Sequence, residues 1–544
     1  MNKIKKIALI FFICLLNILL ITLSQTYPIS ISLNTATFFQ IPVFFWLVMI
    51  ASPFLLYFIS KISKNKFVPI LCAMFYYFIF FSYGLYFLSH PTITDIGSST
   101  FFQEQLAYIT HIGASEIEIQ PYFQWPIYFI FSKMFSSILG ISTIFTLNLG
   151  FMSLISIFPI FIILFYKSRE ISPSISNYFI VPALYLILAF PFLNDQFVPQ
   201  FLSLIYLIIT FGCFAKYRET KSRLFFILII IFYIFTVFSH AFMFIFFVIS
   251  IILEKIWEEY VEKKKKSVIS YEMILLILII PITYLSVYLT KLKSAPFGES
   301  WRIFDYVFSQ TTPGGNGIQI QPLYQLIPEF YDIFFSNMSK IVVAGAFIIV
   351  AIGFILYNLK KREILDFSIM ASTFAWFIMG LSKMVLGQRA LQVAPLALSS
   401  HFKPPHKIFS YFSKIIIVII IISPSLLVAN ALINESLIGE RLVQDTQENI
   451  AGKFLDTHLD NKQYYILTCP NAYPTSLHND IVKADLLSIK TDFISPKLLD
   501  FVVYSPKLKL RSIYMNTSIP RNHQDFVVYK SRNIDIIALR NRIR

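Results

Sequence analysis

A small number of acidic, basic and imidazole side chains interrupt the long apolar runs of this 544-residue chain. Asp95 comes just before STFFQEQLAYITHIG, a segment whose spacing predicts an amphipathic helix on a membrane surface. An aspartate held at that boundary can accept a proton from a hydroxyl group while the hydroxyl oxygen attacks a lipid-linked donor. It can also act only as a cap of the helix that follows. The sequence leaves both roles open.

Three further positions combine polar chemistry with the end of an apolar run. Arg389, with Lys383 nearby, is a cation that needs an anionic partner at that depth. A phosphate of a lipid carrier suits the planar guanidinium group, and snorkelling to lipid headgroups is the alternative. Asp195, in a short turn after Asn194, can hold a divalent cation or an acceptor, or can simply form the turn. His240 can contact a ligand or act as a polar cap.

The composition indicates that the elements positioning these residues lie in a membrane. The chain is 56% hydrophobic and 14% charged, with a mean hydropathy of +0.68. Water-soluble proteins have about 25% charged residues, so a soluble enzyme, a disordered protein and a DNA-binding domain are all poor interpretations. The four cysteines are scattered and form neither a disulfide framework nor a metal-binding spacing.

Thirteen apolar runs are long enough, or nearly so, to cross a bilayer, which takes about 20 residues. The stretch 223–256 is too long for one crossing, so we divide it at Ser239-His240. The predicted spans are 7–25, 39–60, 67–89, 143–166, 174–193, 198–215, 223–239, 241–256, 271–290, 339–358, 364–385, 388–400 and 409–430.

Basic residues gather on one side of these spans. With a cytoplasmic N-terminus, 22 Lys and Arg residues fall in inner loops and only six in outer loops. The asymmetry is typical of an inside-positive membrane protein, and it also accounts for the net charge of +15. The inner residues are Lys3, Lys5, Lys6, Lys61, Lys64, Lys66, Lys167, Arg169, Lys216, Arg218, Lys221, Arg223, Lys255, Lys263, Lys264, Lys265, Lys266, Lys360, Lys361, Arg362, Lys403 and Lys407.

Two segments are ambiguous on hydropathy alone. Residues 122–139 resemble a fourteenth span, but a crossing there would invert every later loop and destroy the charge asymmetry. We therefore predict a helix lying at, or dipping into, the outer interface. Residues 7–25 could belong to a cleaved signal peptide; the long apolar core and the absence of an A-x-A site favour an uncleaved anchor.

The fold class predicted is an α-helical polytopic membrane protein with a small extracytoplasmic α/β domain. The transmembrane part covers 1–430, with large outer loops at 90–142 and 291–338. The tail, 431–544, carries fifteen basic and twelve acidic residues, a density normal for soluble protein. Strand-like pieces occur at 464–468, 501–505 and 526–539, the last as a hairpin across Ser531-Arg532-Asn533.

In its spans, outer loops and external tail, the chain resembles the GT-C superfamily, membrane glycosyltransferases that use polyprenyl-phosphate-linked sugars. Its span count and external tail are similar to those of oligosaccharyltransferase catalytic subunits. Their Trp-Trp-Asp-Tyr-Gly motif is absent here, and the first large loop follows span 3 instead of span 1. The features that match in order and character are Asp95, the aromatic-proline element Tyr122–Pro126, ILGIS at 138–142, Asp195, His240, and Arg389 with Pro395.

The resemblance implies an inverting transfer of a sugar from a polyprenyl-phosphate carrier to a glycan, lipid or protein acceptor at the outer face of the cell membrane. Asp95 would be the general base, and Arg389 with Lys383 would offset charge on the departing phosphate. Gln124, Trp125 and His240 would bind sugar or acceptor. Asp195 would bind the acceptor or, with Asp95, a divalent cation such as Mg²⁺ or Mn²⁺. Metal dependence stays open, and no nucleic acid partner is expected.

Two other classes have similar span counts. A polysaccharide polymerase or ligase usually relies on Arg and His in a large late outer loop, whereas 291–338 offers only Arg302 and no His. A transporter or flippase would want charged residues at mid-membrane depth, and the predicted spans are nearly free of charge. Both classes stay open as alternatives.

The charge asymmetry makes the topology testable. Single cysteines placed at 264 and at 316, in a background with the native cysteines replaced, should react differently with a membrane-impermeant thiol reagent in intact cells. We expect labelling at 316 and protection at 264. Labelling at 264 but not at 316 would invert the predicted orientation.

Overall fold

The computed structural model describes part of the chain. In the bundle the described residues are 43–81, 126–140, 143–169, 175–189, 199–240, 243–261, 269–291, 350–359, 363–381 and 390–400. In the tail they are five strands and Phe454. The predicted span 7–25 lies outside the described residues, and 409–430 has only single described residues.

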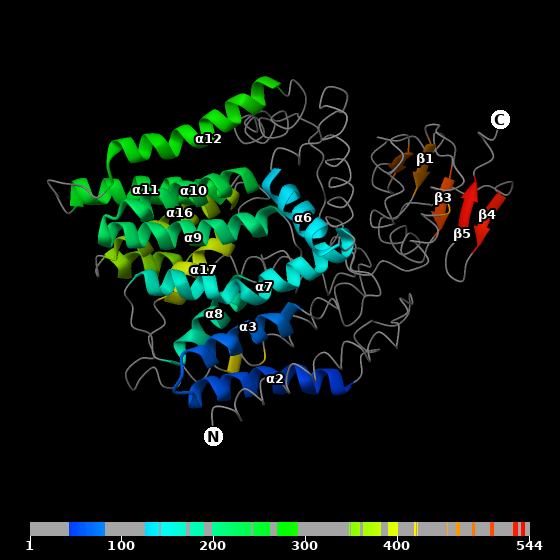
Figure 1. Ribbon diagram of the computed structural model, residues 1–544, viewed down its shortest axis with the longest axis horizontal. Coiled ribbons are helices and arrows are strands. Elements are labelled where there is room, and N and C mark those ends of the chain that lie inside the picture. The colour runs from blue at the N-terminus through cyan, green and yellow to red at the C-terminus, as the bar shows by residue number, and fades with distance from the viewer. Residues whose placement is uncertain are drawn as a thin grey trace.

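The described part of residues 1–430 is helical. Its helices coincide with the predicted spans between residues 39 and 400, including the break that we placed at Ser239-His240. Figure 1 shows most of these helices lying side by side as a bundle. They are α2 (Val43–Ile62), α3 (Phe67–Phe81), α7 (Thr143–Ser168), α8 (Asn177–Ala189), α9 (Pro199–Thr220), α10 (Arg223–Ser239), α11 (Met243–Ile256), α12 (Tyr271–Lys291), α16 (Ile364–Leu381) and α17 (Ala390–Ser400), with a π-helical turn, η4 (Trp257–Val261), after α11.

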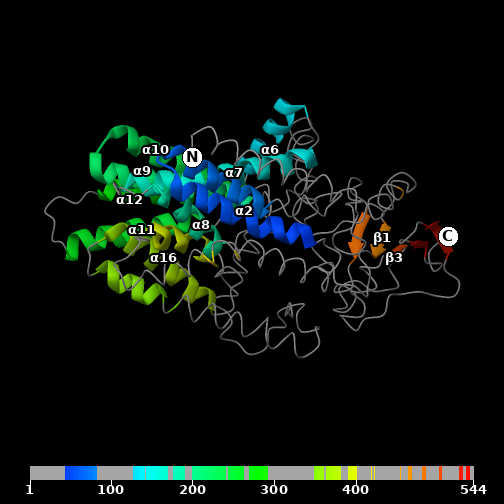
Figure 2. The same cartoon turned by 90° about the horizontal axis from the view of Figure 1, so that it is seen from below.

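The ambiguous segment 122–139 contains α6 (Pro126–Leu139). This helix has 14 residues, about as many as α8 and α11, which lie in predicted spans, so its length does not decide whether the segment crosses the bilayer. Gly140 follows it with φ of +64°, a left-handed conformation that suits a glycine at the end of a helix. Figures 1 and 2 show α6 at one end of the bundle, inclined to the long helices. The interfacial position that we predicted for it stays a prediction.

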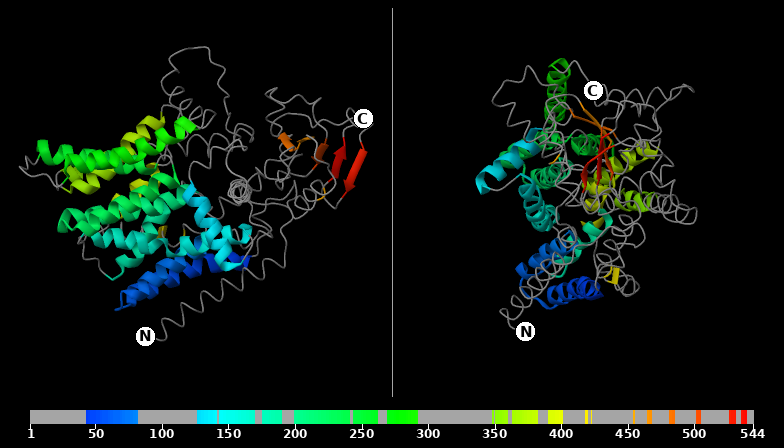
Figure 3. Two further views of the ribbon diagram at one scale, coloured as in Figure 1. Left: turned by 45° about the horizontal axis from the view of Figure 1, so that its top comes forward. Right: turned by 90° about the vertical axis from the view of Figure 1, so that its right-hand side faces the viewer.

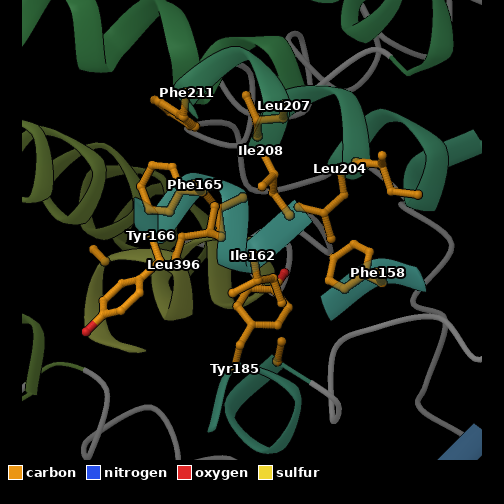
Figure 4. Packing of buried hydrophobic residues seen from close by; sticks show 14 of the residues in the cluster. Phe158, Ile162, Phe165, Tyr166, Tyr185, Leu204, Leu207, Ile208, Phe211 and Leu396 are labelled. Carbon is orange, nitrogen blue, oxygen red and sulfur yellow. The ribbon is translucent and has the colours of Figure 1, made fainter. Parts of the chain in front are cut away.

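The core of the bundle is built from large apolar side chains. Figure 4 shows Phe158, Ile162 and Phe165 of α7 packed against Leu204, Leu207 and Ile208 of α9. Tyr185 of α8 and Leu396 of α17 close the same cluster on the other side of α7. Helix α7 therefore separates α9 from α8, and α9 in turn packs along α10.

The outer faces of the bundle are also apolar. On α2 the exposed side chains Leu47, Ile50, Phe54 and Phe58 recur at helical spacing, and α10 and α12 carry similar stripes. The largest exposed patch of a typical soluble monomer is a few hundred Å², so stripes that run the length of several helices suit lipid, not water. Among the described residues, one stretch, Gln200–Thr220, is by itself long and apolar enough to cross a membrane, and shorter apolar helices of 10–17 residues accompany it. The total of thirteen spans stays a prediction.

Buried ion pairs join the helices at the end predicted to be cytoplasmic. Arg169, just after α7, pairs with Asp366 in the first turn of α16, whose side chain is fully buried. Arg218 near the end of α9 pairs with Glu254 of α11 at 3.0 Å. Lys255 donates to Glu259 at 2.9 Å, and this hydrogen bond holds the pKa of the Glu259 carboxyl below its usual range. The charged groups thus sit at helix ends.

The tail forms a mixed five-stranded sheet in the order β2-β1-β3-β5-β4, from β1 (Tyr464–Leu467), β2 (Ile481–Ala484), β3 (Phe501–Tyr504), β4 (Phe526–Lys530) and β5 (Asp535–Ala538). Strand β1 is parallel to β2 and β3, and β5 is antiparallel to β3 and β4. The hairpin predicted across 531–533 is confirmed, while β2 was not predicted. Figures 1 and 3 show the sheet beyond one end of the bundle.

The buried ion pair between α7 and α16 should contribute to the stability of the bundle. Asp366→Asn keeps the side-chain shape but removes the carboxylate charge that faces Arg169, while Glu363 stays at 3.8 Å. Breaking a buried pair costs about 3–5 kcal/mol. Thermal unfolding in detergent should show a clear loss of stability for this variant.

The control is Glu219→Gln, which removes a partly exposed pair with Lys216 within the last turns of α9. Surface pairs contribute about 0–1 kcal/mol, so the control should unfold near the parent temperature. Equal unfolding temperatures for the two variants would contradict a structural role for Asp366.

Candidate functional site

A pair of buried glutamines joins α9 to α17. The amide nitrogen Nε2 of Gln200 donates to Oε1 of Gln392 at 2.6 Å, and the two residues are 7% and 3% exposed. Gln200 is the second residue of α9, and Gln392 is the third residue of α17. The hydrogen bond therefore connects the N-terminal turns of two helices that are far apart in sequence.

Helix α8 contributes to the same polar cluster. The hydroxyl group of Tyr185 donates to the backbone carbonyl of Gln392 at 2.8 Å in a buried position. The ring of Phe158 on α7 lies against both Tyr185 and Phe201, with centroids 5.6 and 5.5 Å apart. The cluster is thus fixed by hydrogen bonds on one side and by aromatic packing on the other.

The next turn of α9 is bonded to α10. Ser203 Oγ donates to the backbone carbonyl of Thr236 at 3.0 Å. That carbonyl also accepts from the backbone N–H of His240 at 3.2 Å, where the chain leaves α10 in an extended conformation. Because α11 begins at Met243, the partly buried His240 stands at a break between two antiparallel helices.

Helix α6 packs against the same end of the bundle. It contacts α7, α9 and α10, and the ring of Phe131 stacks on that of Phe135 along one of its faces. Tyr128 in its first turn is fully buried. The aromatic-proline element Tyr122–Pro126 leads directly into this helix.

Of the site residues predicted from the sequence, His240 lies within the described part of the chain. Asp95, Gln124, Trp125, Asp195, Lys383 and Arg389 lie outside the described residues. What the structure brings together is the helices that adjoin four of these positions, namely α6 after Trp125, α9 after Asp195, α10 before His240 and α17 after Arg389. Within the described helices and strands, no three His, Cys, Asp or Glu side chains lie close enough to hold a metal ion.

Sequence reasoning did not identify Gln200, Gln392 or Tyr185. A signal was available, because a glutamine inside a predicted span must face the bundle interior and find a partner there. The partner itself was not readable, since 192 residues separate the two glutamines.

Comparison with solved structures decides the architecture. The chain superposes on the crystal structure of the apo oligosaccharyltransferase of Archaeoglobus fulgidus with a TM-score of 0.51 at 11% identity, covering 84% of this chain and 72% of that one. The chain has a GT-C-like fold. The resemblance inferred from the sequence is confirmed at the level of fold.

A second solved structure shows a weaker likeness. ArnT from Cupriavidus metallidurans, bound to undecaprenyl phosphate, gives a TM-score of 0.48 at 10% identity, covering 88% of this chain and 98% of that one. Searches with protein-family models and among curated proteins found no match. The likeness to the oligosaccharyltransferase, at 11% identity, lies in the arrangement of helices, with little sequence in common.

The glutamine pair makes a prediction about stability. Gln392→Leu removes the acceptor of the buried Gln200 amide. Leaving one buried polar group without its partner costs about 1–3 kcal/mol, whereas replacing both partners with apolar groups of similar shape is nearly neutral. The single variant should therefore unfold at a lower temperature than the double variant Gln200→Leu/Gln392→Leu, as measured in detergent. The reverse order would contradict the hydrogen bond.

Proposed function

We propose that this chain is an integral-membrane glycosyltransferase that moves a sugar from a polyprenyl-phosphate carrier to a glycan, lipid or protein acceptor on the outer face of the cell membrane. The GT-C-like fold supports the general class of enzyme. The reaction, the donor and the residue roles below are our proposal.

One observation carries the proposal. The first turns of α9 are hydrogen-bonded both to α17, through Gln200 and Gln392, and to the end of α10, through Ser203. These contacts gather the helix ends next to Asp195, Arg389 and His240 at one end of the bundle. The buried ion pairs lie at the other end. The helix ends next to the predicted site residues and the buried ion pairs thus lie at opposite ends of the bundle.

The proposed reaction for a hydroxyl acceptor is an inverting displacement at the anomeric carbon of the sugar. The acceptor oxygen forms the new glycosidic bond as the bond from the anomeric carbon to the phosphate oxygen breaks. The carrier leaves as polyprenyl phosphate with the bonding electron pair, and Asp95 takes the proton of the acceptor. Atoms and charges balance without a redox partner.

Arg389 would stabilise the departing phosphate, because a guanidinium group can hold two phosphate oxygens through parallel hydrogen bonds. Lys383 would add a second positive charge. A sugar-phosphate placed between base and cation would put Asp95 and Arg389 about 10–15 Å apart in one outer cavity, a spacing set by the need to hold the reacting groups in line.

The other predicted residues would bind and orient. Gln124, Trp125 and His240 would contact the sugar or the acceptor, and Asp195 would hold the acceptor. Asp95 and Asp195 are also the carboxylates that would bind a divalent cation such as Mg²⁺ or Mn²⁺ if one takes part. No step of the proposal depends on that ion.

The proposed base is tested by Asp95→Asn. Asparagine keeps the size and the capping ability of aspartate but cannot accept the proton. Because removal of a general base costs about 10²–10⁴ in rate, transfer from a radiolabelled polyprenyl-phosphate sugar should fall by that factor while expression stays at the parent level. Glu219→Gln, at the opposite end of α9, is the control and should transfer at the parent rate. An unchanged transfer rate in Asp95→Asn would show that Asp95 is not the general base and would leave it only the role of a helix cap.

The proposed cation is tested by Arg389→Lys. Lysine keeps the charge but loses the planar fork, so we expect kcat to fall by about tenfold or more, with the carrier still bound. The same assay, run over a range of donor concentrations, separates kcat from KM. Unchanged kcat and KM in this variant would instead indicate that the Arg389 side chain contacts lipid headgroups and not the donor phosphate.

A further inference from the structure

We propose that Gln200 and Gln392 are positioning residues that hold Asp195 and Arg389 in register with each other. The inference rests on the proposed function, because it assigns the two glutamines a role in the same glycosyl transfer. We assign neither glutamine a catalytic role, because both side chains are buried and hydrogen-bonded to each other.

The position of the pair along the chain supports this role. Gln392 follows Arg389 by three residues, and Gln200 follows Asp195 by five. Each glutamine thus lies in the first turn of the helix that follows its site residue in the sequence. A rotation of α17 against α9 would therefore shift one site residue relative to the other.

The chemistry of the pair also suits positioning better than stabilisation. A buried amide hydrogen bond contributes only about 0.5–1.5 kcal/mol net, but it is directional and is lost when the two helices slide or rotate. Leucines would fill the same space and would favour many nearby packings almost equally. The Tyr185 hydroxyl adds a third helix to the register by binding the backbone of Gln392.

The chain offers a matched control at another interface. Ser250 of α11 donates to Ser372 of α16 at 3.1 Å, and both side chains are fully buried. This pair also links two helices that are distant in sequence. It adjoins none of the proposed site residues. Loss of the serine pair therefore tests whether any weakening of the bundle lowers transfer.

The experiment compares Gln200→Leu/Gln392→Leu with Ser250→Ala/Ser372→Ala. Both should purify and unfold near the parent temperature. We expect the leucine variant to lose about 10–100-fold in kcat, the cost of small misplacements of reacting groups, while the alanine variant keeps the parent rate. Should the leucine variant fail to fold, Gln392→Asn keeps an amide but shortens it by one methylene. That variant should unfold at a lower temperature, because the Gln200 amide loses its acceptor, and its kcat, measured well below that temperature, should fall by about tenfold.

A double-mutant cycle separates positioning from general weakening. If the glutamines act through Arg389, then the leucine pair and Arg389→Lys together should lose less than the product of their separate losses. Losses that multiply, or a leucine variant with parent kcat, would overturn the inference and leave the proposed function standing. A parent chain that transfers no sugar would overturn the proposed function itself.

Discussion

The arrangement of the bundle depends on hydrogen bonds that α9 makes with its neighbours. In a bundle with apolar outer faces, a buried amide or hydroxyl group cannot form a hydrogen bond with water. Its hydrogen-bond partner must therefore come from another helix or from the backbone of its own helix. Gln200 bonds to α17 and Ser203 bonds to α10 within the first two turns of α9. Each bond is modest in net energy, but each fixes the rotation and the height of one helix against another. Helix α9 thus fixes the positions of both α17 and α10 at the end of the bundle that carries the proposed site.

The two ends of the bundle use different polar groups for a physical reason. The end joined by Arg169, Arg218 and their acidic partners places full charges where the helices leave the apolar region. Because the Asp366 and Glu254 side chains are fully buried there, the desolvation of each carboxylate must be offset by its basic partner. The other end uses neutral amides and hydroxyls, which cost less to bury. A site at that end can then contain few charges, and each remaining charge acts strongly on a charged donor because little else screens it.

The sequence predicted the helices of the bundle well and their contacts poorly. Hydropathy measures how favourably each single residue enters the bilayer, so it locates spans but not the contacts between them. The break at Ser239-His240 was predicted because the apolar stretch 223–256 is too long for one span. The α10–α11 division and the 531–533 hairpin are both present. Strand β2 was missed because four residues, IVKA, carry no clear period. The Gln200–Gln392 and Arg169–Asp366 pairs were missed because they join positions almost 200 residues apart. Of the candidate site, His240 is the one predicted residue within the described chain.

These observations explain how a fold can be shared at 11% identity. Helix packing in an apolar bundle tolerates exchange among Phe, Ile and Leu as long as volume and spacing are kept. Polar positions are different, because a buried amide specifies both its partner and the geometry between them. The described core is built from many apolar residues, whereas the helix ends that adjoin the proposed site are joined by a few polar ones. Under the proposed function, the interhelical hydrogen bonds of Tyr185, Gln200 and Ser203 should therefore constrain activity more tightly than the core that surrounds them.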